Sequence, residues 1–206
     1  MDEDVRLMLA LRAGDGAAFD ALFARWSAPL LRYLERLVRE PALAEELAQE
    51  VFLRVYRARE RYEPDARFST WLFTIATRLA WNELRRPRHR NPHEPLEGDE
   101  EMAPLPLASG APAADAVVEA RRTGALVEQA LDRLPERQRA ALWLAAVEGL
   151  SYAEVAALLE TTERSVKALV HRARTALADH VRALRRADPG AGAPDREPGR
   201  RLRGAT

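Results

Sequence analysis

Two segments of the chain are rich in basic side chains and poor in acids, a composition that suits contact with nucleic acid. Five arginines and one acid, Glu83, lie between residues 78 and 90; seven bases and one acid, Asp179, lie between residues 164 and 186. Guanidinium and ammonium groups neutralise phosphates, and an amide such as that of Asn82 can both donate to and accept from a base edge. The two segments therefore predict two nucleic-acid-binding surfaces.

The histidines do not suggest a catalytic or metal centre. His89 and His93 are four residues apart but lie among prolines, so they do not share a helical face. No histidine–glutamate zinc motif, glycine-rich phosphate loop or nucleophile elbow occurs in the sequence. We therefore expect no catalytic residue, no metal and no cofactor, and a protein that is not an enzyme.

The overall composition is that of a globular protein with an uneven charge distribution. Of 206 residues, 47% are hydrophobic and 31% charged, with a formal net charge of zero. The net charge is zero because basic and acidic segments offset each other: residues 91–120 carry seven acids and no lysine or arginine. The acidic N-terminus is unlike a secretory signal, no apolar run reaches the roughly 18 residues of a membrane span, and cysteine is absent. We expect no membrane insertion and a cytoplasmic location.

Apolar residues recur at helical spacing on both sides of a proline-rich stretch. Residues 1–86 are predicted to form one helical domain, with breaks at Gly14, Pro41 and Pro64. Residues 87–114 are predicted to be a disordered acidic linker, residues 115–186 a second helical domain, and residues 187–206 a disordered tail. The fold class is therefore all-α: two small helical domains joined by a flexible Pro-rich acidic linker.

The second domain contains the pattern of a helix-turn-helix between residues 152 and 170. Ser151 and Glu154 form a capping box, and Ala156 is small enough for two helices to cross closely. Gly149 suits a left-handed helix end and Thr162 the cap of the last helix. The turn itself has Glu160 where glycine is usual, which we expect to cost about 1 kcal/mol.

Three stretches closely resemble the sigma-70 family of RNA polymerase sigma factors. EELAQEVFLRVYRA, residues 45–58, is similar to the helix that docks on the clamp of the polymerase largest subunit. RFSTWLFTIATRLAWNELRR, residues 67–86, resembles the part that recognises and melts the −10 element. LPERQRAALWLAAVEGLSYAEVAALL and SVKALVHRARTAL resemble the −35-binding domain. Because only a proline-rich linker separates the two domains, the resemblance is to the extracytoplasmic-function (ECF) group.

This resemblance implies the roles of particular residues. For the −10 element they are Arg67, Arg78, Trp81, Asn82, Arg85 and Arg86. For the −35 element they are Arg164, Ser165, Lys167, Ala168, His171, Arg172 and Arg174, on an outward face of the second helix of the motif. For the polymerase they are Glu46, Gln49, Glu50, Arg54 and Arg57. Phe68 and Trp71 are expected in the core. Trp81 is equally compatible with a place in the core and with an exposed position where a base stacks on its ring.

The expected partners follow from the same resemblance. They are core RNA polymerase, through the clamp and the flap of the second-largest subunit, promoter DNA, and an anti-sigma factor. Two alternatives from the residues alone are a helix-turn-helix regulator that never binds polymerase and a protein-interaction scaffold of two helical bundles. A polymerase pull-down and a promoter-dependent transcription assay separate them from a sigma factor.

Overall fold

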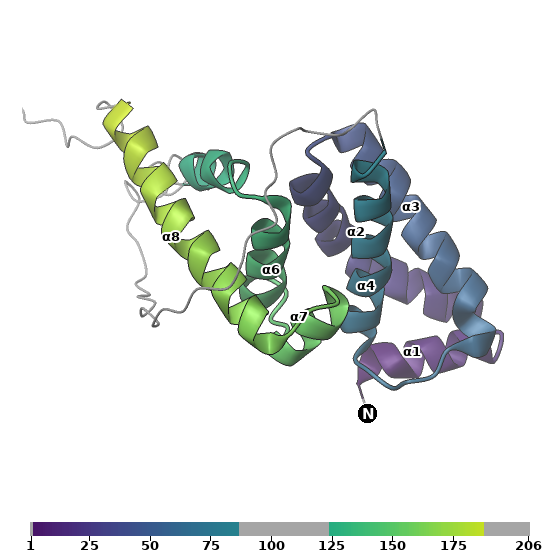
Figure 1. Ribbon diagram of the computed structural model, residues 1–206. Helices are drawn as coiled ribbons and strands as arrows, with labels where there is room; N and C mark the ends of the chain where they lie inside the picture. The colour runs from purple at the N-terminus through teal and green to yellow at the C-terminus, as the bar shows by residue number, and fades with distance from the viewer. Residues whose placement is uncertain (1, 87–123, 188–206) are drawn as a thin grey trace, which may run out of the picture.

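The computed structural model describes residues 2–86 and 124–187 (Figure 1). Regular structure within these two ranges is entirely helical, which confirms the predicted fold class. The predicted linker and C-terminal tail lie outside the described residues, apart from Ala187, so the predicted domain limits remain predictions. Across the described ranges, no helix has the length and apolar content needed to cross a bilayer.

The N-terminal domain consists of helices whose ends match local sequence signals. They are α1 (Glu3–Arg12), α2 (Gly16–Val38), α3 (Pro41–Ala58), the 3₁₀ turn η1 (Arg59–Arg61) and α4 (Phe68–Leu84). The Asp2 and Asp15 carboxylates accept hydrogen bonds from backbone N–H groups in the first turns of α1 and α2. Pro41 opens α3, where its missing N–H costs nothing.

The core of this domain is built around α4, which packs against both α2 and α3. Phe73 is fully buried, and its ring lies edge-on to Tyr33 at 5.2 Å and to Trp26 at 6.0 Å between centroids. The Tyr33 hydroxyl donates to Thr77 Oγ1 at 2.7 Å, while Thr77 Oγ1 donates to the Phe73 carbonyl at 2.7 Å. Burial raises the pKa of Tyr33, so this hydroxyl stays protonated and able to donate.

Thr77→Val is expected to lower the free energy of unfolding by about 1–3 kcal/mol, because it leaves the buried Tyr33 hydroxyl without its acceptor. Adding Tyr33→Phe should recover most of this loss, because two apolar groups then replace the hydrogen-bonded pair. Urea denaturation of the single and double variants measures both effects. A double variant as unstable as the sum of the single changes would contradict this account.

The second domain contains the predicted helix-turn-helix. Residues 124–131 are helical, followed by α6 (Glu136–Ala146), α7 (Tyr152–Leu158) and α8 (Glu163–Ala187). Gly149 has φ +67°, and both hydrogen bonds of the Ser151–Glu154 capping box are present. Thr162 Oγ1 accepts from the Ser165 N–H at 3.1 Å at the start of α8. These three signals were predicted correctly.

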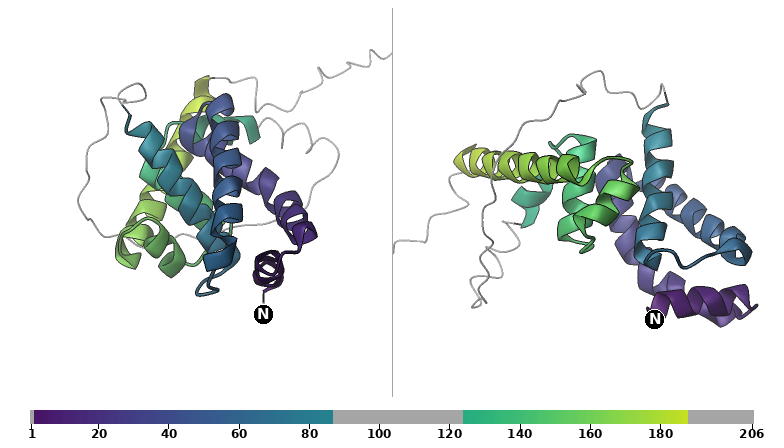
Figure 2. Two further views of the ribbon diagram at one scale, coloured as in Figure 1. Left: turned by 90° about the vertical axis from the view of Figure 1, so that its right-hand side faces the viewer. Right: turned by 60° about the horizontal axis from the view of Figure 1, so that its bottom comes forward.

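The two domains pack directly against each other. Helix α7 lies beside α4, and α6 contacts α2 (Figures 1 and 2). Arg36 on α2 pairs with Glu128 at 2.6 Å, and Arg39 donates to the Leu134 carbonyl at 3.1 Å. Buried apolar residues of both domains form one continuous cluster. The sequence predicted two domains on a tether and did not predict this interface.

Candidate nucleic-acid interface

Helix α8 buries one side and presents a basic side. Val166, Val170 and Ala173 are buried, where α8 packs on α6 and α7. Of the predicted −35 residues, the exposed ones are Arg164, Lys167 and Arg174, and the half-buried ones are Ser165, Ala168, His171 and Arg172. The described part of the motif therefore presents cations from its second helix, as a major-groove reader requires.

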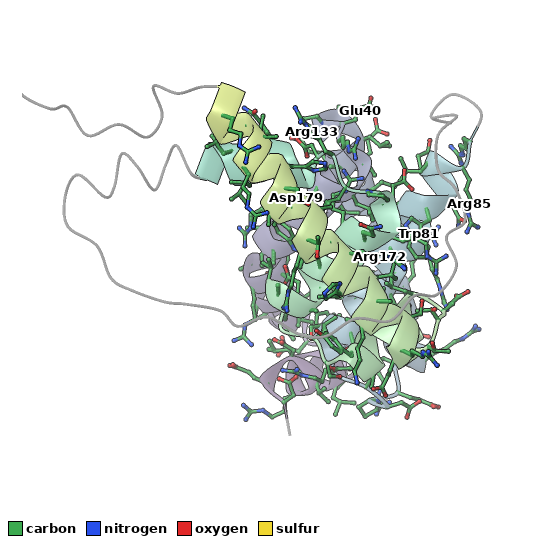
Figure 3. The ribbon with its side chains drawn as sticks, turned by 60° about the vertical axis from the view of Figure 1, so that its left-hand side comes forward. Glu40, Trp81, Arg85, Arg133, Arg172 and Asp179 are labelled. Carbon is green, nitrogen blue, oxygen red and sulfur yellow. The ribbon has the colours of Figure 1, made fainter. Side chains whose placement is uncertain are left out.

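Arg172 is less accessible than the sequence predicted. Figure 3 shows it in the middle of α8, between the start of the helix and Asp179. Its Nε atom is buried, and the side chain is only partly exposed. Because an arginine held against its own protein has less reach, Arg164 and Lys167 are the better candidates for contacting DNA, and a role for Arg172 in reading a base remains a prediction.

The turn between α7 and α8 has the left-handed backbone that the sequence indicated. Glu160 has φ +53°, a conformation that glycine adopts without strain and a glutamate does not. Thr161 N–H donates to the Ala156 carbonyl at 2.9 Å, which closes the end of α7. The motif therefore keeps its geometry despite the glutamate.

The second basic surface lies along the C-terminal half of α4. Asn82 and Arg78 are one turn apart and exposed. Arg85 follows at the helix end (Figure 3). Arg67, which precedes α4, is also exposed, whereas Arg86 pairs with the buried Glu83 at 2.7 Å. Helical spacing thus brings Arg78, Asn82 and Arg85 to one side of α4.

The aromatic residues of α4 divide between core and surface. Phe68 is fully buried and Trp71 is partly buried, with its ring 5.1 Å from that of Tyr62, so both belong to the packed interior as expected. Trp81 is half-buried, and the guanidinium carbon of Arg137, from α6, lies 5.1 Å from its ring centroid. In this structure a cation from the second domain therefore covers Trp81.

The predicted polymerase-binding residues follow the solvent side of α3. Leu47, Val51 and Val55 are buried against the core. The predicted residues are exposed at Glu46, Gln49, Arg54 and Arg57 and half-buried at Glu50. Glu50 accepts from Arg54 Nε at 2.7 Å, which lowers the pKa of Glu50.

An aromatic patch that was not predicted from the sequence lies beside these residues. Phe23 on α2 is 48% exposed, and Leu53 and Tyr56 on α3 are 49% and 44% exposed. The Phe23 ring lies 4.8 Å from that of Phe52, and Phe19 lies 5.5 Å from Tyr56. We call Phe19, Phe23, Phe52, Leu53 and Tyr56 the aromatic patch. The signal was present, because Leu53 and Tyr56 fall off the α3 stripe that Val51 and Val55 define.

One helical domain has a helix-turn-helix whose second helix is basic, and the other has exposed arginines on α4 and directly beside it, which together define a DNA-binding protein. The family profile described as Sigma-70 region 2 matches residues 22–90, and the profile described as Sigma-70, region 4 matches residues 125–177. Among curated relatives, the RNA polymerase sigma-H factor of Pseudomonas aeruginosa is 31% identical over 193 residues, which cover 90% of this chain and 97% of the relative. The RNA polymerase sigma factor CarQ of Myxococcus xanthus is 40% identical over 163 residues, covering 78% and 88%. The chain belongs to the sigma-70 family of RNA polymerase sigma factors, in its ECF group.

Two solved structures share the fold. CnrH, solved in complex with the cytosolic domain of CnrY, has a TM-score of 0.61 and 24% identity, covering 91% of this chain and 99% of its own. The sigma factor RpoE from Bartonella quintana, solved in complex with the anti-sigma factor NepR, has a TM-score of 0.58 and 21% identity, covering 80% and 96%. At these identities the likeness shows the all-helical fold.

Proposed function

We propose that α8 binds the −35 element and the C-terminal half of α4 binds and helps open the −10 element while α3 holds the chain on core RNA polymerase. The observation that carries this is that each of the two matched regions of the family presents exposed basic side chains, in one region on and beside α4 and in the other along α8. Promoter opening requires a base to leave the stack and be held by hydrogen bonds and neighbouring cations. Asn82 offers the amide, and Arg78 and Arg85 offer the cations. The protein itself is not an enzyme on this proposal, because the chemistry belongs to the polymerase.

The aromatic patch extends the proposed polymerase contact. Its exposed apolar side chains, on α2 and α3, adjoin the charged and polar residues Glu46, Gln49 and Arg57 of α3. An apolar centre with a polar margin fits a protein partner better than a phosphate backbone. The patch therefore supports α3 and the adjoining part of α2 as the surface that meets the clamp.

An anti-sigma factor is the proposed regulator, acting where the polymerase is, in the cytoplasm. Both solved proteins of the same fold are in complex with a partner, and one partner is named an anti-sigma factor. The described residues contain no cluster of histidine, cysteine or acidic groups suited to a metal, so nothing in them indicates a metal-based sensor.

Run-off transcription from genomic fragments tests the proposed function. Core polymerase with the chain should start at discrete sites that core polymerase alone does not use, and a pull-down should recover the two together. A chain that does not join core polymerase, or joins it without any start-site selectivity, would overturn the proposal.

Asn82→Ala is expected to impair promoter opening by about 1–3 kcal/mol, or roughly 5- to 150-fold, because it removes hydrogen bonds to an extruded base. Binding of the closed promoter should change much less, because the phosphate contacts remain. Permanganate reactivity of unpaired thymines, compared with promoter retention, separates the two steps. Gln129→Ala, which removes another exposed side-chain amide, is the control; equal losses in both variants would contradict a specific role for Asn82.

A further inference from the structure

Helix α1 precedes residues 22–90, the part of the chain that the Sigma-70 region 2 profile matches. It is nevertheless firmly attached to that part. Met8 is fully buried in the core that α1 shares with the other helices of the domain. Arg25 on α2 donates to the buried Asp4 and to Glu3, each at 2.6 Å. A group that α1 holds is therefore held by the whole domain.

A loop of five exposed residues, 63–67, leads into α4. The residues on either side of it, Tyr62 and Phe68, are buried. Both rings lie against Trp71, at 5.1 Å and 5.9 Å between centroids. The last residue of the loop is Arg67, one of the predicted −10 residues. A loop between two fixed ends can still take several paths, and the path it takes determines what surrounds Arg67.

Arg12, in the last turn of α1, holds the beginning of this loop. Its Nη1 donates to the backbone carbonyl of Tyr62 at 3.2 Å, although the two residues are 50 positions apart. Helix α1 also contacts η1, and the segment that joins α3 to α4 passes alongside α1 (Figures 1 and 2). The Tyr62 carbonyl belongs to the rigid peptide plane that leads to residue 63, so this hydrogen bond fixes the direction in which the chain enters the loop.

The Tyr62 side chain contributes its ring to this attachment, and its hydroxyl does not take part. The hydroxyl is buried and has no hydrogen-bond partner among the residues that the structure describes. Burial, together with the charges of Asp2 and Asp4, raises the pKa of Tyr62, so the hydroxyl is protonated at neutral pH. The entry to the loop is therefore held by the ring on Trp71 and by the carbonyl on Arg12.

We infer that Arg12 is a positioning residue for promoter opening: by holding the Tyr62 carbonyl it fixes the path of loop 63–67, and so the surface around Arg67 that meets the −10 element. This inference rests on the proposed function, together with the prediction that Arg67 is a −10 residue. It gives α1 a part in promoter opening through the loop, without a contact between Arg12 and DNA.

Arg12→Met keeps most of the side-chain stem and removes the donor. Holoenzyme with this variant should open promoters about three- to tenfold less well, the range that the loss of one hydrogen bond gives. Permanganate reactivity of unpaired thymines measures opening. Retention of the closed promoter and circular dichroism should be unchanged, because Arg12 is exposed and contributes little to the core.

Two further variants separate the hydrogen bond from the charge. Arg12→Lys keeps both a donor and the charge, and should recover most of the opening. Arg6→Met removes the same charge from another exposed position on α1 and is the matched control, which should open promoters as well as the unaltered chain.

Trypsin cleavage of the free chain tests the loop itself, apart from any DNA. Phe68 is fully buried, so trypsin reaches the bond after Arg67 in molecules whose loop has come loose. Arg12→Met should be cut there about three- to tenfold faster than the unaltered chain, because the loop has lost one of its attachments. Arg6→Met should be cut at the unaltered rate. Mass spectrometry of the early fragments measures cleavage at this bond.

The inference would be overturned by equal cleavage of Arg12→Met and the unaltered chain, by faster cleavage without a loss of opening, by an equal loss in Arg6→Met, or by no recovery in Arg12→Lys. A shallower salt dependence of promoter binding by Arg12→Met would also overturn it, because Arg12 would then contact a phosphate directly. Run-off transcription by the unaltered chain is scored separately. If it succeeds while these tests fail, the role of Arg12 is wrong and the proposed function stands; if it fails, the proposed function is wrong.

Discussion

Phe73→Ala is expected to lower the free energy of unfolding by about 3–5 kcal/mol, a large fraction of the total stability of a small helical domain. The Phe73 side chain is fully buried, and its ring meets Tyr33 and Trp26 edge-on. Alanine loses the transfer free energy of the ring and leaves a cavity that rigid neighbours on α2 cannot close. Urea denaturation followed by tryptophan fluorescence measures the loss.

Phe23→Ala is the matched control for this prediction. It deletes the same ring from α2 at a site that is 48% exposed, so its cost should be about 1 kcal/mol or less. Equal destabilisation by the two substitutions would show that Phe73 is not central to the packing of α4. Phe23→Ala also removes part of the aromatic patch, so weaker binding to core polymerase with unchanged stability would support that surface.

The helices and their ends could be predicted from the sequence because their causes are local. The α3 stripe of Leu47, Val51 and Val55 follows the helical period, and the structure buries all three. The Ser151 capping box and the left-handed Gly149 depend only on residues within a few positions of each other. Such short-range signals determine where a helix begins and ends, whatever the helix packs against.

The contact between domains could not be predicted in the same way. Its polar pairs join residues far apart in the chain: 84 positions separate Thr70 from Glu154, and 82 separate Arg78 from Glu160. Each of these side chains is also a reasonable solvent-exposed residue by itself, so composition gives no sign of the pairing. Glu160 was the one available clue, as a glutamate in a turn that favours glycine.

The candidate nucleic-acid interface was also predicted only in part, in the features that depend on local spacing. Helical spacing placed Arg78, Asn82 and Arg85 on one side of α4, because residues three and four apart share a face. It did not reveal that Arg172 is partly enclosed, since that depends on how α8 sits on its neighbours. The exposure of Phe23 likewise depends on how α2 packs against α3.

Replacing both Arg164 and Lys167 with alanine is expected to weaken promoter binding by the holoenzyme by about 2–4 kcal/mol, or roughly 30- to 1,000-fold. Both side chains are exposed in the first turns of α8, the part of a recognition helix that enters the major groove. Losing two cations from the DNA interface should also make the logarithmic salt dependence of binding shallower, by up to about 2 units. Filter binding over a range of salt concentrations, on promoter fragments recovered by run-off transcription, measures both quantities.

The control for this last prediction is Arg182→Ala with Arg186→Ala, which removes the same charge from the far end of α8. Both arginines are exposed, and Arg182 pairs with Asp179 at 2.7 Å. If α8 docks by its N-terminal turns, this variant should bind promoters nearly as well as the unaltered chain, because its lost charges lie beyond the groove. Equal weakening by the two variants would mean that the helix attracts DNA only through its total charge, and the assignment of the −35 surface would then be wrong.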